Sequence, residues 1–218
     1  MFKFSVRGRA ATLAVLTGAG IAGLSFAGSA GAAVSPHGLK VIKITPTCTV
    51  KLSGATIGSA AYTVSAQTET SATAAKPGAA VQLTDVQFKV TIPGKYITDA
   101  VNFGFTEAWG SVKTLDIVAS DAKAGTGTHN AASPAIVFAT SAKPIVFTAT
   151  EEKNGLTLAL PAKAETVKGY GAGSTRGNMT FTSGPIAIAA TFKGSGGSEP
   201  VTVSCTSTKT ALNTQAVS

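Results

Sequence analysis

An alternation of apolar and polar residues recurs along almost the whole chain after Lys40 and constrains the fold more than any other feature. In the stretch VQFKVTI, residues 86–92, apolar side chains fall on one face of a strand and polar ones on the other. Threonine, valine, isoleucine and phenylalanine are abundant, and only 13% of the chain is charged. This pattern is typical of half-buried strands. Further segments with the same pattern are AYTVSAQT, SVKTLDIVA, KPIVFTAT, GLTLALPA, NMTFT, PIAIAATFK and PVTVSC.

One of these strands contains a change of phase. Val86 and Phe88 lie on the same face, whereas the preceding Val81 and Leu83 fall in the opposite phase. A one-residue insertion at residues 84–85 would let both halves face the core, so the sequence predicts a β-bulge there.

Three segments interrupt the alternation. PGKYITDAVNFGF, residues 93–105, has apolar residues at helical spacing and predicts a short helix that crosses between two sheets. Asn154-Gly155 predicts a hairpin turn. The polar stretch AKAGTGTHNAAS, residues 122–133, predicts a mobile loop. This loop could divide two lobes, but each would hold few strands, so we favour one antiparallel β-sandwich with a shared core.

The start of the chain has the pattern of a secretory signal peptide. Lys3, Arg7 and Arg9 precede an uncharged run, residues 10–27, and small residues then allow cleavage after Ala32. A retained anchor is disfavoured because glycines interrupt the run, which is at the short limit for ~30 Å of hydrocarbon. No later stretch is apolar enough to span a membrane. We expect a secreted, extracellular protein that is free or associated with the cell wall.

These observations predict four regions. They are a signal peptide at residues 1–32, a disordered tail at residues 33–39, a β-sandwich at residues 40–210 and a C-terminal tail at residues 211–218.

The chain is basic, and most of its positively charged residues are lysines. Of 18 lysines and arginines, three lie in the predicted signal peptide, and all 10 acidic residues lie beyond it. Arg176 is the one arginine after the signal peptide, which argues against sequence-specific nucleic-acid binding, because arginine is the usual bidentate reader of bases and phosphates. Two interpretations remain: attraction to an anionic surface polymer, or a charge that only keeps the protein soluble.

The two cysteines occupy equivalent places in two predicted strands. Cys48 shares a face with Val50 in TCTVKL, and Cys205 shares a face with Val203 in PVTVSC. Both thiols therefore point inward, one from the first predicted strand and one from the last. In an oxidising compartment such a pair predicts a disulfide, with two buried free thiols as the alternative.

The chain resembles an uncharacterised domain family of secreted actinobacterial proteins. The segments that carry the resemblance are TCTV, LTDVQFKVTIPGKYITDAV and the terminal PVTVSCT, within residues 41–216. It implies an immunoglobulin-like secreted β-sandwich with a cysteine pair at Cys48 and Cys205, and it carries no assigned activity. The chain is richer in lysine and poorer in proline than the family pattern.

No constellation of residues in the sequence predicts catalysis, a metal site or a cofactor. His37 lies in the predicted tail and His129 in the predicted loop, with no carboxylate near it in sequence. The motifs of serine hydrolases and zinc proteases are missing. The aspartates are scattered, and the pair Glu151-Glu152 lies beside the predicted turn, where we expect it to be solvated.

Three residues are candidates for ligand binding. Trp109 is the one tryptophan, and we interpret it as a core residue rather than a platform for sugars. Tyr170 and Arg176 lie in GYGAGSTRGN, which predicts a long hairpin loop that could carry a recognition tip.

The leading hypothesis from the sequence is a non-enzymatic structural or interaction module of the cell envelope or extracellular space. The alternative is a module that binds glycans or an anionic cell-wall polymer. A hydrolase with a dispersed site around His129 is a third hypothesis. The expected partner is a wall polymer or another surface protein, without nucleic acid or cofactor.

Overall fold

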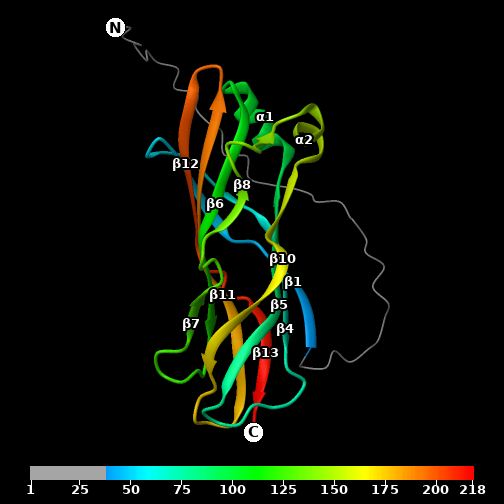
Figure 1. Ribbon diagram of the computed structural model, residues 1–218, viewed down its shortest axis with the longest axis vertical. Coiled ribbons are helices and arrows are strands. Elements are labelled where there is room, and N and C mark those ends of the chain that lie inside the picture. The colour runs from blue at the N-terminus through cyan, green and yellow to red at the C-terminus, as the bar shows by residue number, and fades with distance from the viewer. Residues whose placement is uncertain (1–37) are drawn as a thin grey trace. The chain divides into compact units, whose positions relative to one another are not determined.

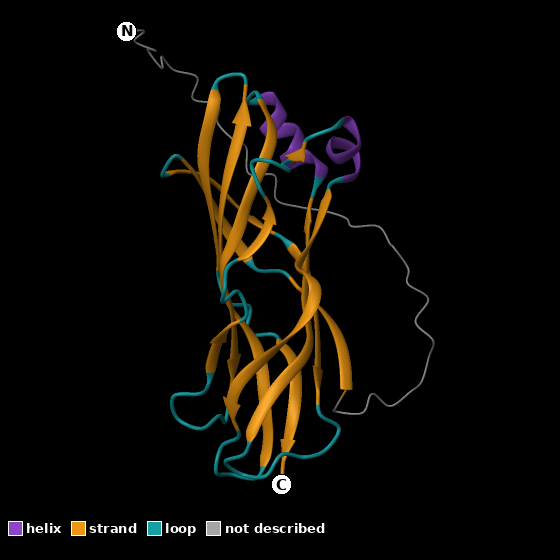
Figure 2. Ribbon diagram, viewed as in Figure 1, coloured by secondary structure: helices purple, strands orange, loops and turns teal. Residues whose placement is uncertain are grey.

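Residues 38–218, which the computed structural model describes, form two antiparallel β-sheets and two helices (Figures 1 and 2). Sheet A has the strand order β1-β4-β5-β10. Sheet B is nine-stranded, with the order β3-β2-β12-β11-β6-β7; β13 pairs with β11, and both β8 and β9 pair with β6. The predicted all-β, antiparallel β-sandwich is confirmed. The predicted signal peptide and residues 33–37 lie outside the described residues, whereas Gly38 and Leu39, expected in the tail, begin β1.

The strands of sheet A are β1 Gly38–Ile44, β4 Thr63–Thr70, β5 Ala80–Ile92 and β10 Leu156–Gly171. The strands of sheet B are β2 Thr47–Leu52, β3 Ala55–Ala61, β6 Phe105–Ala119, β7 Thr128–Asn130, β8 Ile136–Ala139, β9 Ile145–Val146, β11 Gly177–Gly194, β12 Gly197–Cys205 and β13 Ala211–Val217.

One hydrophobic core joins the two sheets. Leu83 and Phe88 of β5 belong to the same buried cluster as Leu115 of β6 and Phe181 of β11. Burial of each such side chain contributes about 1.5–3 kcal/mol. The prediction of one sandwich with a shared core is therefore confirmed, and the polar stretch at residues 122–133 does not divide the domain.

The predicted bulge in β5 is present. The β4–β5 register shifts between Gln67, opposite Gln87, and Glu69, opposite Thr84. Asp85 takes up the inserted residue with a φ of 50°. As a result, the inward side chains on both sides of the bulge are buried, namely Val81, Leu83, Val86 and Phe88.

The predicted crossover helix is also present. Helix α1, Gly94–Asn102, connects β5 of sheet A to β6 of sheet B and buries Ile97 and Ala100. It lies beside helix α2, Ala149–Asn154 (Figure 2). The approach is so close that a β-carbon at Gly94 would overlap the carbonyl oxygen of Glu152. Within residues 38–218, neither helix is long and apolar enough to cross a bilayer.

Helix α2 replaces the hairpin that the sequence analysis expected at Asn154-Gly155, so that prediction is wrong. Thr148 caps the helix: its Oγ1 accepts from the Thr150 amide at 3.2 Å, and its own amide donates to Glu151 Oε2 at 3.1 Å. This reciprocal capping box stabilises a helix start and outweighs the strand propensity of the preceding residues. Gly155 ends the helix with a φ of 79°.

The predicted C-terminal tail at residues 211–218 is also wrong, because residues 211–217 form strand β13. Leu212 and Val217 are buried in the core cluster. The Asn213 side-chain amide donates to the carbonyl oxygens of Gly38 at 3.0 Å and Thr68 at 3.1 Å, which ties β13 to both β1 and β4. The sandwich therefore extends to Val217.

The stretch expected to be a mobile loop contains an ordered strand. Residues Thr128–Asn130 form β7 against β6. Asn130 Oδ1 accepts from the amides of Leu115 at 2.8 Å and Ala132 at 2.9 Å, and Nδ2 donates to the Lys113 carbonyl at 3.1 Å. These bonds hold the segment to the sheet, so the expectation of mobility across this whole stretch is corrected.

Candidate functional site

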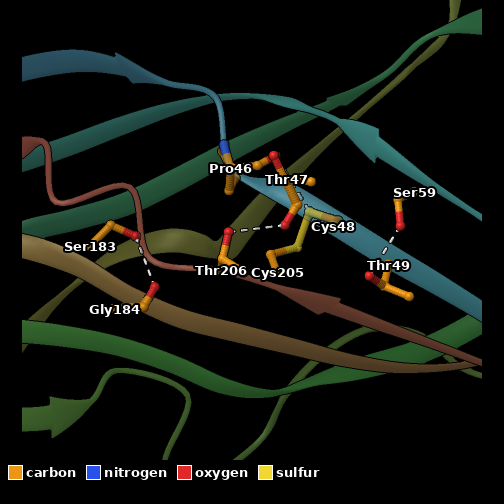
Figure 3. The surroundings of a disulfide bond; sticks show 9 residues. All are labelled: Pro46, Thr47, Cys48, Thr49, Ser59, Ser183, Gly184, Cys205 and Thr206. Carbon is orange, nitrogen blue, oxygen red and sulfur yellow. Dashed lines mark hydrogen bonds between the residues drawn. A yellow bond between two sulfur atoms is a disulfide. The ribbon is translucent and has the colours of Figure 1, made fainter.

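Cys48 and Cys205 form a disulfide between directly opposite residues of β2 and β12 (Figure 3). The predicted bond is confirmed, but these are the second and the penultimate strands rather than the first and the last. Cys48 is 2% and Cys205 is 8% exposed. The bond lies within one sheet, unlike the inter-sheet disulfide of antibody domains. Its burial indicates a structural role, and it closes a sequence separation of 157 residues.

Tyr170 does not form the recognition tip that its sequence context suggested. It belongs to β10, is 1% exposed, and donates from its hydroxyl to the Ile117 carbonyl at 3.2 Å. Its ring packs edge-on against His129 and Phe181, at centroid distances of 4.4 and 5.0 Å. Burial raises the pKa of its hydroxyl. The correction follows from the length of β10, which continues through Gly171.

Arg176 and Trp109 lie far from each other. Arg176 is exposed in the turn between β10 and β11 and forms no ion pair within residues 38–218. Trp109 is half-buried on β6 opposite Thr191 and is not part of the main core cluster. The two positions are separated by most of β11, roughly 46 Å at about 3.3 Å per residue. They cannot contribute to one small site.

A different group of residues is brought together by an irregular part of β10. The β5–β10 ladder has three register shifts, all between Leu160 and Tyr170. Val167 and Tyr170 point into the core, whereas Glu165 and Lys168 are exposed. Bulges redirect side chains in this way and are frequent beside binding sites.

The larger of two pockets at this segment has a volume of about 680 Å³. The β4–β5 loop, residues 71–79, forms one wall together with the start of β5, and Lys168 and Gly169 of β10 form another. Gln215 of β13 also lines the pocket. We call this the large pocket. Its volume is within the usual range of small-molecule sites.

A carboxyl pair stands at the rim of the large pocket. Glu69 lines the pocket and accepts from Thr84 Oγ1 at 3.4 Å. A hydrogen bond with Asp85, followed by partial desolvation and the repulsion of the Asp85 charge, raises the pKa of Glu69. The pair can therefore offer both a donor and acceptors to a ligand when it holds a proton.

The second pocket has a volume of about 160 Å³ and is also lined by Lys168. We call it the small pocket. Its lining is almost entirely polar and includes His129 and Asn130 of β7, Ser133, and Glu165 and Lys168 of β10. Lys168 is exposed and lines both pockets, so the two pockets are neighbours.

Each pocket is lined by one residue with a buried side-chain polar atom that lacks a hydrogen-bond partner among residues 38–218. These two atoms, the only ones of their kind in the part of the chain that the structure describes, are Oε1 of Gln215, which lines the large pocket, and Nε2 of His129, which lines the small pocket. The orientation of the Gln215 amide follows from its nitrogen, which donates to the carbonyls of Thr73 at 2.9 Å and Ala216 at 3.3 Å.

The titratable side chains that line the small pocket are His129, Glu165 and Lys168. His129 Nε2 makes no hydrogen bond to a hydroxyl or a carboxylate in the described chain. Within residues 38–218, no group of three or more His, Cys, Asp or Glu side chains could hold a metal ion.

Neither pocket can be recognised in the sequence, because their residues are distant along the chain and belong to no motif. The one local signal is the concentration of polar residues in β13. No known family model, curated protein or solved structure matches this chain.

Proposed function

We propose that the protein is a secreted, non-enzymatic interaction module that binds a partner of the cell envelope or extracellular space through the two pockets beside Lys168. The observation that carries this proposal is the pair of pockets that share Lys168, each lined by one residue with a buried polar atom that lacks a partner among residues 38–218. Buried polar atoms without partners are rare in folded proteins and are frequent at functional sites. The resemblance to secreted actinobacterial domains belongs to the same proposal.

The scaffold supports a binding role. The shared core contains side chains of the strands that line the pockets, among them Val81 of β5, Val167 of β10 and Leu212 of β13, and a well-packed support reduces the entropy lost when a ligand binds. A disulfide is also compatible with an oxidising, extracellular environment.

A second candidate function is attachment to an anionic cell-wall polymer through lysine side chains. Fifteen of the 18 lysines and arginines lie in the described chain, and one of them, Lys193, forms an ion pair there, with Glu107 at 3.4 Å. Lys43 and Lys89 lie on the outer face of sheet A on either side of Ser65. The cations come from strands, helices and loops along the whole described chain, which suits a diffuse, salt-sensitive attraction.

Fractionation of the producing cells would test both candidates. The cell wall is washed with increasing salt, and the protein is followed by mass in the wall, the wash and the medium. Retention that resists salt and saturates with added protein supports binding through the pockets. Retention that is lost as salt rises supports attachment through the lysine side chains, because exposed charges are screened.

Two results would contradict the proposal. Recovery of all the protein in the medium, with no saturable retention of added full-length protein, excludes an envelope partner. Release of soluble fragments from the wall in proportion to added protein and time would identify an enzyme.

A further inference from the structure

We propose that the large and small pockets form one site for an uncharged, hydroxyl-rich ligand, namely a neutral oligosaccharide. This inference rests on the proposed binding function and specifies the chemical class of the ligand. It departs from the anionic polymer that the basic charge of the chain suggests.

The two unsatisfied atoms require a particular kind of partner. Gln215 Oε1 is an acceptor without a donor in the described chain, its residue is only 1% exposed, and a ligand donor that reaches it from the large pocket would satisfy it. His129 Nε2 donates or accepts according to its tautomer. A hydroxyl group is both a donor and an acceptor, so it satisfies Gln215 and either tautomer of His129.

The remaining polar groups of the site also match hydroxyls. Lys168 is a donor only, and the carboxyls of Glu69 and Glu165 act mainly as acceptors. A ligand that carries hydroxyls on several sides can meet all of these groups at once. Apolar wall is supplied by Val81 and by small alanine side chains, including Ala72 and Ala80, against which the C–H faces of a sugar can pack.

The local charge disfavours an anionic ligand, although the chain as a whole is basic. Glu69 and Glu165 line the pockets, and Asp85 lies against Glu69. Lys168 is the single lysine or arginine among the lining residues of the described chain. An acidic sugar would therefore meet more negative than positive charge, which costs affinity at short range.

The size of the site fits several sugar units. The large pocket has a volume of about 680 Å³ and the small pocket about 160 Å³, and Lys168 belongs to both. A linear oligosaccharide that crosses Lys168 would place hydroxyls in both pockets. Contacts on both sides of one lysine make this residue the most informative position to change.

The first experiment is an NMR titration of the full-length protein with four neutral trisaccharides: maltotriose, cellotriose, mannotriose and the trimer of N-acetylglucosamine. Trigalacturonic acid serves as the anionic comparison. The proposal predicts saturable shifts at the Gly169 amide and at the side-chain amide of Gln215 with at least one neutral sugar. The acidic trimer should bind more weakly.

A matched pair of variants then tests the location of the site. Lys168 and Lys163 are both exposed residues of β10, but only Lys168 lines the pockets. Lys168→Ala should weaken binding of the neutral sugar about tenfold or more through loss of charged hydrogen bonds. Lys163→Ala should leave the affinity unchanged within about twofold, because Lys163 lines neither pocket.

His129→Phe provides a second test, because it keeps an aromatic ring against Tyr170 and removes both ring nitrogens. The variant should fold and should bind the sugar about three- to tenfold more weakly, since one hydrogen bond is lost. Unchanged affinity would remove the small pocket from the site.

Other outcomes separate this inference from the proposed function. If no neutral trisaccharide shifts either amide while the protein is still retained by the wall in a salt-resistant manner, the inference is overturned and the proposed function survives. Salt-sensitive binding of trigalacturonic acid that is indifferent to Lys168→Ala overturns the inference in favour of the lysine surface. A loss of wall retention without loss of sugar binding contradicts the proposed envelope partner instead.

Discussion

The β2–β12 ladder and the β5–β10 ladder are both antiparallel, yet they differ in regularity. Five consecutive residue pairs join β2 to β12 without a register shift, and the Cys48–Cys205 bond lies at one end. Three register shifts interrupt the β5–β10 ladder, and Lys168 lies among them. The regular ladder points apolar side chains inward and stabilises the fold. The irregular ladder exposes polar side chains beside two pockets.

The two buried polar atoms without a hydrogen-bond partner in the described chain belong to residues beside the irregular ladder, not beside the regular one. Each of the two pockets beside Lys168 is lined by one residue that carries such an atom. From this difference we infer that the regular ladder mainly stabilises the fold and that the irregular ladder mainly serves the proposed binding site. It can be tested by changes that should affect stability, binding or both.

The largest expected effect comes from removal of the disulfide. A Cys48→Ala and Cys205→Ala double variant should lose about 2–5 kcal/mol of unfolding free energy, because the bond restricts a long loop in the unfolded chain. Urea denaturation of both proteins measures this difference. At low denaturant the double variant should still bind the ligand of the wild type. A loss below about 1 kcal/mol would show that the disulfide is not a main source of stability.

Asn213 offers a sharper comparison because it neighbours Gln215 in β13. Asn213 has hydrogen bonds on both its oxygen and its nitrogen, whereas Gln215 Oε1 has none in the described chain. Asn213→Ala should therefore cost about 2 kcal/mol of stability, since it leaves the buried carbonyl of Thr68 without this donor. Sugar or wall binding by the folded variant should not change. If the variant lost binding when compared at an equal folded fraction, Asn213 would have to be counted as part of the binding site.

Tyr170 connects the core to the small pocket through its contact with His129. Tyr170→Phe removes the hydroxyl that donates to Ile117, which should cost about 1 kcal/mol. The ring contact with His129 remains, so binding should be retained. Thermal unfolding and a ligand titration check the two halves of this prediction. A binding defect larger than the stability defect would indicate that this hydroxyl positions His129.

The smallest expected effect is electrostatic. Asp85 raises the pKa of Glu69, first through a hydrogen bond. A carboxyl whose folded pKa is raised binds its proton more tightly in the folded state, so this contribution to stability is present at low pH and is lost as pH rises through the folded pKa. Asp85→Asn should lower the Glu69 pKa toward its usual value of 4.5 and weaken this pH dependence.

Carboxyl-detected NMR titration of Glu69 in the two proteins provides the measurement. Glu107, which pairs with Lys193 in the other sheet, serves as the control carboxyl. An unchanged Glu69 titration in the variant would place the cause of the raised pKa outside the carboxyl pair.

Local patterns predicted the parts of the fold that depend on neighbouring residues. The phase change at Asp85 and the helical spacing of residues 94–102 can be recognised because each is encoded within a few positions. The T-x-x-E capping box at Thr148 was equally local, but the strand-forming residues before it and the Asn154-Gly155 pair after it favoured a hairpin. In that case two local signals competed, and the helix cap prevailed.

By itself, the sequence determined an all-β sandwich, the bulge of β5, the crossover helix and the cysteine pair, because alternation and inward-facing thiols need only the geometry of a single strand. The tertiary structure alone decided the role of β13 and the position of the candidate site. Glu69, His129, Lys168 and Gln215 come from four different strands. Only the packing of the sheets and the register shifts of β10 bring them together, and no local pattern in the sequence encodes those long-range contacts.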